Sequence, residues 1–287
     1  MAASGDRDGA RRAADEARAV TPPDDHDALF GVGRAYAAAG AWDDAIAAWS
    51  DVGAGPQLLR LGRDLARGPD WQASISAFVA ASRLGAPGRS GPDGAATTAL
   101  AHGQSAEEAI AHLAPLIASG GTVGYRARLE SARVYRLTGQ PERAQQALLE
   151  AERAGPDDQL ELERALINLD LNQPYASEAA LVWIVAHPIE PADGIPDGDD
   201  PRYWLAVAQA RVGKPDDALA TARAGLAALS PQQASLRVPY HLLIGDTLLS
   251  LGRPVDAMTT FRAGQRLAPT DPRLADGVAR AQAALRR

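Results

Sequence analysis

Apolar residues recur at helical spacing in paired segments, and a turn-forming residue separates the two members of each pair. Leu29 and Tyr36 fall on one face of a helix, Gly40 follows them, and residues 45–52 carry the apolar face of a second helix. The same order of positions returns at residues 244–264. The pattern predicts two antiparallel helices joined by a tight turn as the building block of this chain.

This building block repeats along the chain. In seven segments a small residue stands five residues after a turn-type position, and successive small residues are 29, 35, 35, 35, 39 and 39 residues apart. The turn positions are Gly40, Pro69, Gln104, Gly139, Pro174, Gly213 and Gly252, and the small residues are Ala45, Ser74, Ala109, Ala144, Ala179, Ala218 and Ala257. Such a period is typical of an array of small stacked units. Further small residues are expected where paired helices approach closely: Gly33, Gly62, Ala132, Ala206 and Gly245.

The spacing resembles that of the tetratricopeptide repeat family, whose unit has about 34 residues. Residues 28–49 match that pattern closely, residues 238–269 match it again, and the resemblance covers residues 10–270. It implies an all-α fold, a right-handed α-solenoid of about seven helix-turn-helix repeats with terminal capping helices. It implies no single function, because this scaffold serves many different partners.

One continuous array is expected rather than two separate cores. Residues 1–24 are interpreted as an N-terminal half-repeat or capping helix, 25–269 as the tandem repeat array, and 270–287 as a C-terminal capping helix. The half-repeat has two interpretations that the sequence leaves open, a native cap or the cut edge of a longer array.

Two units depart from the pattern. Pro115 falls inside the second helix of the third unit and should kink or shorten it. In the fifth unit Glu163 and Asp170 occupy positions that are normally apolar, which favours a shift of the first helix by one residue. The shift would turn three leucines inward: Leu162, Leu166 and Leu169.

Composition agrees with a helical protein that has no membrane-spanning segment. Hydrophobic residues make up 46% of the chain but aromatic residues only 5%, as expected of alanine-rich helix packing. The longest strongly apolar run, residues 179–186, is too short to span a bilayer, and no export signal is visible. A cytoplasmic location is therefore expected, although a soluble region of a membrane protein would have the same features.

The residues offer no catalytic, cofactor or metal site, so the chain is not expected to be an enzyme. There are no cysteines, and the five histidines fall at unrelated points of the repeat without metal-ligand spacing. Two segments rich in Gly, Pro and Asp, 86–95 and 187–202, are expected to be solvated connections. The acids of the second segment lack the spacing of a calcium-binding loop.

The family resemblance also implies that the first helices of successive units line a concave groove. The corresponding positions are Phe30, Arg34, Leu59, Arg63, Arg67, Arg126, Leu129, Arg133, Arg136, Arg164, Asn168, Asn172, Tyr203 and Arg211. A basic groove is therefore expected in a chain whose formal net charge is -7. The balancing acids stand in the first turns of second helices, where they complement the helix dipole: Asp43, Asp44, Glu107, Glu108, Glu142, Asp216, Asp217 and Asp256.

These positions predict a non-catalytic scaffold that binds a protein or peptide segment. The basic groove favours an acidic segment, since arginine can hold a carboxylate through two donors. An alternative is that arginine, almost the chain's only basic residue, falls on the groove by chance. Binding of nucleic acid is disfavoured by a pI of about 5.3.

A regulatory or assembly module of a larger enzyme or membrane-associated complex is the alternative function. Self-association through the convex face or the open N-terminal end is compatible with both.

Overall fold

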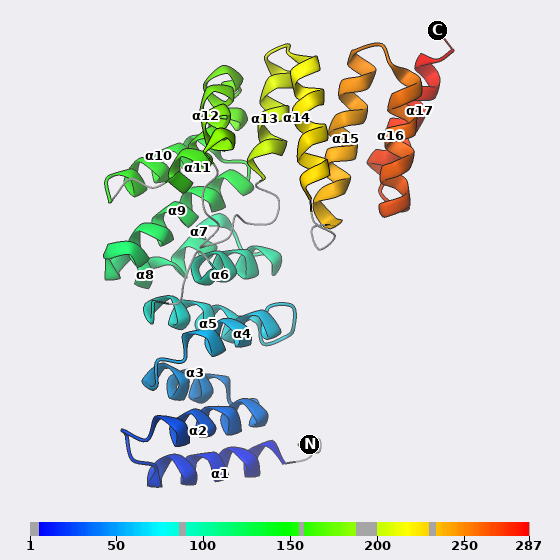
Figure 1. Cartoon of the computed structure of the whole chain (residues 1–287). Helices are drawn as coiled ribbons and strands as arrows, with labels where there is room; N and C mark the ends of the chain where they lie inside the picture. The colour runs from blue at the N-terminus through cyan, green and yellow to red at the C-terminus, as the bar shows by residue number, and fades with distance from the viewer. Residues whose placement is uncertain (1–5, 86–89, 155–157, 188–199, 230–233, 287) are drawn as a thin grey trace. The chain divides into compact units, whose positions relative to one another are not determined.

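The computed structural model describes residues 6–85, 90–154, 158–187, 200–229 and 234–286. Within these ranges the regular structure is entirely α-helical, and neighbouring helices pack as antiparallel pairs (Figure 1). The all-α prediction is confirmed. No helix in these ranges combines the length and the hydropathy needed to cross a membrane.

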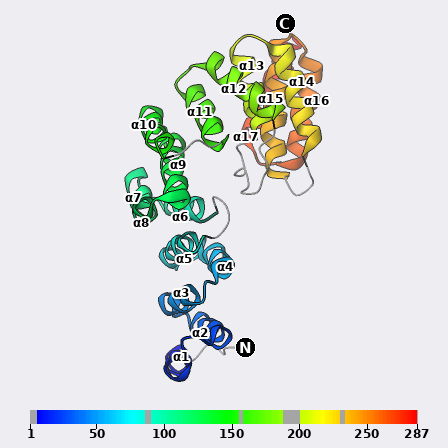
Figure 2. The same ribbon diagram turned by 60° about the vertical axis from the view of Figure 1, so that its left-hand side comes forward.

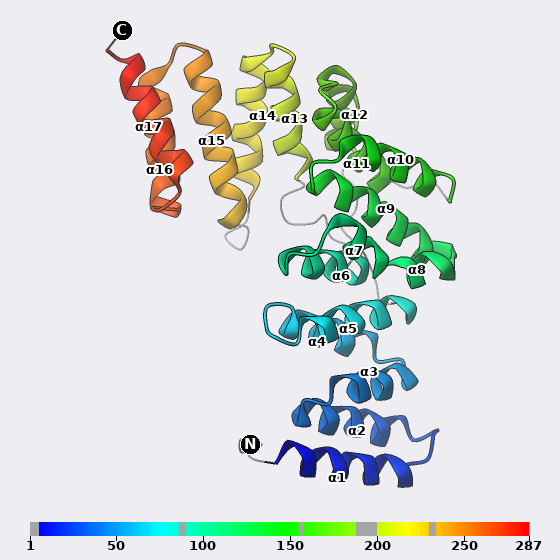
Figure 3. The same ribbon diagram turned by 180° about the vertical axis from the view of Figure 1, so that it is seen from behind.

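The helices form two compact units, which we describe separately. Unit 1 contains α1 (Arg7–Val20), α2 (His26–Ala39), α3 (Trp42–Asp51), α4 (Gly55–Leu65), α5 (Trp71–Arg83), α6 (Ser90–Ala101), α7 (Ala106–Ala111), α8 (Ala114–Ser119), α9 (Gly121–Leu137) and α10 (Pro141–Glu152). Unit 2 contains α11 (Asp158–Asp170), α12 (Pro174–Ala186), α13 (Pro201–Arg211), α14 (Pro215–Ala228), α15 (Ala234–Ser250), α16 (Pro254–Leu267) and α17 (Pro272–Ala284). In unit 1 the helices α1 to α5 follow one another as layers (Figures 1 and 2), and in unit 2 α13 to α17 stand side by side (Figure 3).

Most of the turns inside the repeats share one hydrogen-bonded geometry. Gly40 has φ 73° and ends α2, and the next residue, Ala41, donates its N–H to the carbonyl of Tyr36 at 3.0 Å. Gly139, Gly213 and Gly252 have the same positive φ, and the residue after each donates to the carbonyl five positions back. This arrangement satisfies carbonyl groups that a helix end leaves without partners. A proline at the start of the next helix then fits because it needs no donor there.

The fifth unit uses the same turn two residues earlier than the sequence pattern predicted. Asn172 adopts φ 57°, and Gln173 donates to the carbonyl of Asn168 at 2.8 Å. Ser177 is therefore the fully buried small residue of this unit, and Ala179 is exposed. The assignment of Ala179 to the packing position was wrong because Pro174, taken as the turn residue, begins α12.

The other six small residues of the repeat have no exposed surface. Leu162, Leu166 and Leu169 point inward as expected, but Glu163 is buried with them. Pro115 divides the second helix of the third unit into α7 and α8, so the predicted shortening is confirmed. The segment 86–95 was expected to be a connection, but α6 already begins at Ser90; residues 86–89 lie outside the described ranges.

Aromatic rings of second helices fill space that glycines leave open on first helices. A Cβ atom on Gly33 would lie 2.5 Å from the Trp49 ring, and one on Gly245 would lie 2.4 Å from the Phe261 ring. The glycines are required because backbone and ring approach too closely for any side chain between them. The expectation of close approach at these positions is confirmed.

Ion pairs join residues that are one repeat apart. Arg11 pairs with Asp44 at 2.8 Å, and Arg280 pairs with Asp246 at 2.8 Å. Lys214 pairs with Glu178 at 2.8 Å, thirty-six residues before it. Exposed pairs of this kind contribute about 0 to 1 kcal/mol each, so the buried apolar residues carry the larger share of the stability.

Candidate partner-binding site

A pocket lies between α2 and α4, the first helices of two successive repeats in unit 1. The first helices of later repeats in this unit pack directly, α4 on α6 and α6 on α9, but α2 and α4 do not pack closely on each other. The connection from α3 to α4 is only Val52, Gly53 and Ala54. The space left between α2 and α4 has a volume of about 510 Å³.

The floor of this pocket is aromatic. Trp49 of α3 is 2% exposed, and its ring centroid lies 6.2 Å from that of Phe30 on α2. The Trp49 Nε1–H donates to the Phe30 carbonyl at 3.2 Å, which fixes the ring and leaves no unpaired donor beneath the pocket. Ala37, Trp42, Leu61 and Leu65 complete the apolar lining. We call this space the Trp49 pocket.

Charged groups stand at the rim of the Trp49 pocket. Arg34 is exposed, and no described residue forms an ion pair with it. Arg60 lies 3.8 Å from Asp64, with both side chains about two thirds exposed, so water screens that pair. Of the two rim cations, Arg34 is therefore the one without an ionic partner among the described residues, and it stands beside an apolar floor.

The structure places the other predicted groove residues differently. Arg63 on α4 and Arg67 in the turn after α4 are exposed but do not line the pocket, and Leu59 is only 7% exposed. Leu129 has no exposed surface. Arg126 is half-buried on α9.

Arg133 and Arg136 are also buried, although the family resemblance implied that they line an open groove. Arg133 is 5% exposed and forms ion pairs with Asp93 of α6 and Glu130 of its own helix. Arg136 is 8% exposed. These side chains lie where α9 meets the preceding repeat, so Arg133 holds the repeats together instead of facing solvent.

In unit 2 several of the predicted residues have structural contacts. Arg211 donates to the Leu169 carbonyl at 2.7 Å and so caps the end of α11, and Asn172 forms the turn described above. Arg164 lies 3.6 Å from Glu161, and Asn168 is half-buried. Tyr203 is packed edge-on against two other aromatic rings, and burial raises the pKa of its hydroxyl.

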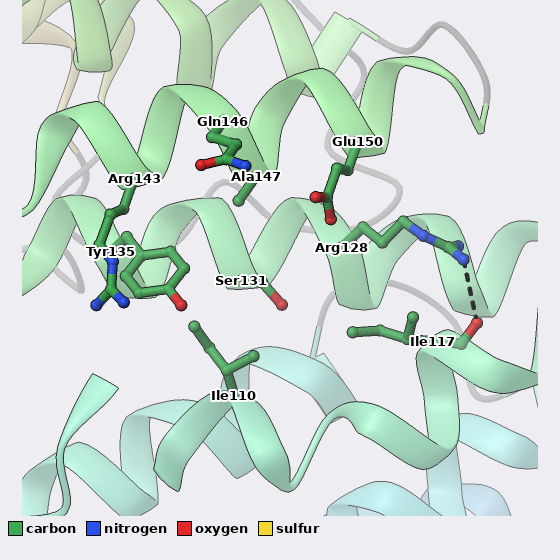
Figure 4. A pocket seen from close by; sticks show the side chains of 9 residues that line it. All are labelled: Ile110, Ile117, Arg128, Ser131, Tyr135, Arg143, Gln146, Ala147 and Glu150. Carbon is green, nitrogen blue, oxygen red and sulfur yellow. Dashed lines mark hydrogen bonds between the residues drawn. The ribbon is translucent and has the colours of Figure 1, made fainter. Parts of the chain in front are cut away.

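A second, smaller pocket of about 280 Å³ lies in unit 1 among α7, α8, α9 and α10 (Figure 4). It opens where Pro115 divides the second helix, so that Ile110 and Ile117 face it from two short helices. Its cations are already engaged. The Arg143 guanidinium lies over the Tyr135 ring at 5.1 Å and pairs with Glu107, and Arg128 donates to the Ile117 carbonyl at 3.4 Å.

Two of the described histidines stack on tryptophan rings. His102 stacks on Trp71, and its Nε2–H donates to the Ala66 carbonyl at the end of α4. His187 stacks on Trp183. Among the described residues no three His, Asp or Glu side chains converge into a group that could hold a metal ion. Of the acidic segment 187–202, residues 188–199 lie outside the described ranges, while Asp200 caps α13 and accepts the Tyr240 hydroxyl at 2.8 Å.

Comparison with known proteins agrees with this architecture. The sequence profile of the tetratricopeptide repeat matches residues 2–58, 94–159 and 203–272, well over half of the chain. The crystal structure of a tetratricopeptide repeat protein from Parabacteroides merdae ATCC 43184 is similar with a TM-score of 0.55 and 14% identity, over 90% of this chain and 98% of that one. A chain in the crystal structure of the APC/C hetero-tetramer Cut9-Hcn1 is similar with a TM-score of 0.56 and 15% identity, over 96% of this chain and 60% of that one. No protein with a curated description matches the sequence. At this identity the structural likeness shows the fold alone.

Proposed function

The chain belongs to the tetratricopeptide repeat family, and from this we propose that it is a non-catalytic interaction module that binds a protein segment in the Trp49 pocket. An apolar side chain of the segment lies on Phe30 and Trp49, and an acidic neighbour pairs with Arg34. Repeats of this family generally serve as protein-interaction modules. One observation carries the proposal, namely the separation of α2 from α4 over an aromatic floor beside an open cation.

The magnitudes assign different roles to the two contacts. Burying one aliphatic or aromatic side chain on the floor contributes about 1.5 to 3 kcal/mol. A carboxylate paired with exposed Arg34 contributes roughly 0.2 to 1 kcal/mol and is screened by salt. The apolar anchor therefore supplies most of the affinity at this site, and Arg34 selects segments that carry an acid beside the anchor.

The test begins with selection of phage-displayed random dodecapeptides against the full chain. The binding of one enriched synthetic peptide is then measured by fluorescence polarisation against the wild type, Phe30→Ala, Arg34→Glu and Arg83→Glu. Arg83 is an exposed arginine at the end of α5 that does not line the pocket, so its variant controls for the change of charge.

We expect enriched peptides to carry an acid next to an apolar residue. Phe30→Ala should weaken binding at least tenfold, Arg34→Glu should weaken it several-fold and reduce its salt dependence, and Arg83→Glu should leave it unchanged. Circular dichroism checks that each variant keeps its helix content. Peptides that bind Phe30→Ala and Arg34→Glu as tightly as the wild type would refute the pocket as the binding site.

A further inference from the structure

Helix α12 of unit 2 is apolar on both of its faces. Its only charged residue is Glu178, which pairs with Lys214 within the same unit. The inward face buries Ser177, Leu181 and Ile184 against neighbouring helices. A surface helix normally turns polar residues outward, and a helix that is apolar all round is normally covered on all sides.

The outward face of α12 carries a continuous apolar stripe instead. Tyr175 is 71% exposed, and Val182 and Trp183 are each 48% exposed. Ala179 and Ala186 are exposed between and beyond them. The largest apolar patch on a protein surface often has an interaction role.

We propose that this stripe binds the same stripe of a second copy of the chain, with the two α12 helices antiparallel about a two-fold axis. The positions 175, 179, 182 and 186 follow one another at intervals of four, three and four residues, the spacing of a two-helix seam. A two-fold contact is self-complementary, since each pair of facing residues occurs twice.

The order of large and small residues along the stripe fits that symmetry. In the antiparallel arrangement Tyr175 lies opposite Ala186 of the second copy, and Val182 lies opposite Ala179 of the second copy. Tyr175 and Val182 therefore each meet a small residue, as interdigitated packing requires. The stripe itself carries no charge, so the two copies do not repel each other along it.

The exposed area indicates a weak dimer. Aromatic side chains bury roughly 150 to 250 Å² each, so the stripe with its alanines offers about 400 to 500 Å² per copy. The total of about 800 to 1,000 Å² falls in the range of weak, transient contacts, below the size of a standard interface. The copies should therefore associate at micromolar and higher concentrations and separate on dilution.

Sedimentation equilibrium of the full chain tests the proposal over a range of concentrations. The wild type should move from the 30.0 kDa of one chain towards twice that mass as its concentration rises. Ala179→Glu places a charge in the middle of the stripe and should weaken association at least tenfold. Val255→Glu is the matched control, because Val255 is 58% exposed on α16 and lies outside the stripe.

Thiol cross-linking tests the register of the two α12 helices. The chain contains no cysteine, so only the introduced thiols can react. An equimolar mixture of Ala179→Cys and Val182→Cys should form covalent dimers faster than either variant alone, because only the mixed pair faces across the axis. Asp256→Cys mixed with Thr259→Cys, at the same spacing on α16, should show no such gain. Two results would overturn the proposal: a chain that stays monomeric at every concentration, or a dimer that Ala179→Glu leaves intact.

Discussion

The close packing of Gly62 against Phe78 predicts that a single added methyl group destabilises unit 1. A Cβ atom at residue 62 would lie 2.8 Å from two carbons of the Phe78 ring and 2.9 Å from a third. The ring has little room to retreat, because a Cβ on Gly94 of the next repeat would lie 2.6 Å from the same edge of the ring. Phe78 is thus held between two helix backbones, and Gly62→Ala must move a helix.

The magnitude follows from two opposing effects. Overpacking of a core costs about 1 to 3 kcal/mol, whereas replacing glycine by alanine within a helix favours folding by up to about 1 kcal/mol. We expect a net destabilisation of about 1 to 2 kcal/mol. Gly31→Ala is the matched control, because nothing lies within 4 Å of its added Cβ and only the favourable effect remains.

The assay is urea unfolding of the full chain followed by far-ultraviolet circular dichroism. Because repeat proteins need not unfold in one step, the first transition midpoints of the variants are compared. Gly62→Ala should lower that midpoint and Gly31→Ala should raise it. A midpoint for Gly62→Ala at or above that of the wild type would refute the reasoning, since it would mean that the Phe78 ring can move without loss of stability.

Three further predictions concern single residues. Arg133→Ala removes one member of a buried ion pair and should lower the free energy of unfolding, measured in urea, by about 3 to 5 kcal/mol. The control Arg63→Ala, at an exposed site, should change it by less than about 0.5 kcal/mol. Equal effects of the two variants would contradict the burial of Arg133. Asn172→Gly should preserve the thermal midpoint and Asn172→Ala should lower it, because only the alanine resists the left-handed φ of 57°. Burial and the hydrogen bond to Asp15 raise the pKa of Tyr36 to about 12 from 10.0, so its contribution to stability is complete below pH 10 and is lost as the pH rises towards 12. Tyr36→Phe should therefore flatten the alkaline fall in stability, and an unchanged fall would contradict this assignment.

Local features of the sequence were sufficient for the helix pairs and most of their turns. Glycine with proline two residues later marks the turns at 139, 213 and 252, and the same spacing, with asparagine in place of glycine, marks the turn at 172. Aligning those prolines would have placed Ser177 correctly at the packing position. Pro115 likewise predicted the break between α7 and α8.

The candidate site could be predicted only in part. Phe30 and Arg34 were identified by their place in the repeat, and both line the Trp49 pocket. The pocket itself was missed, because it exists only where α2 and α4 fail to pack, and no local pattern encodes that separation. Trp49 was identified only as a packing residue.

The sequence by itself determined where helices begin, where they end and which faces are apolar, since these depend on neighbours within a few residues. The tertiary structure decided which of those residues remain accessible. Arg133 occupies a position that the repeat assigns to the groove, yet Asp93, forty residues away, meets it and buries it. Helix α12 contains the longest strongly apolar run of the chain, yet its Tyr175 is exposed. Exposure depends on contacts between distant segments, and a local pattern contains no record of them.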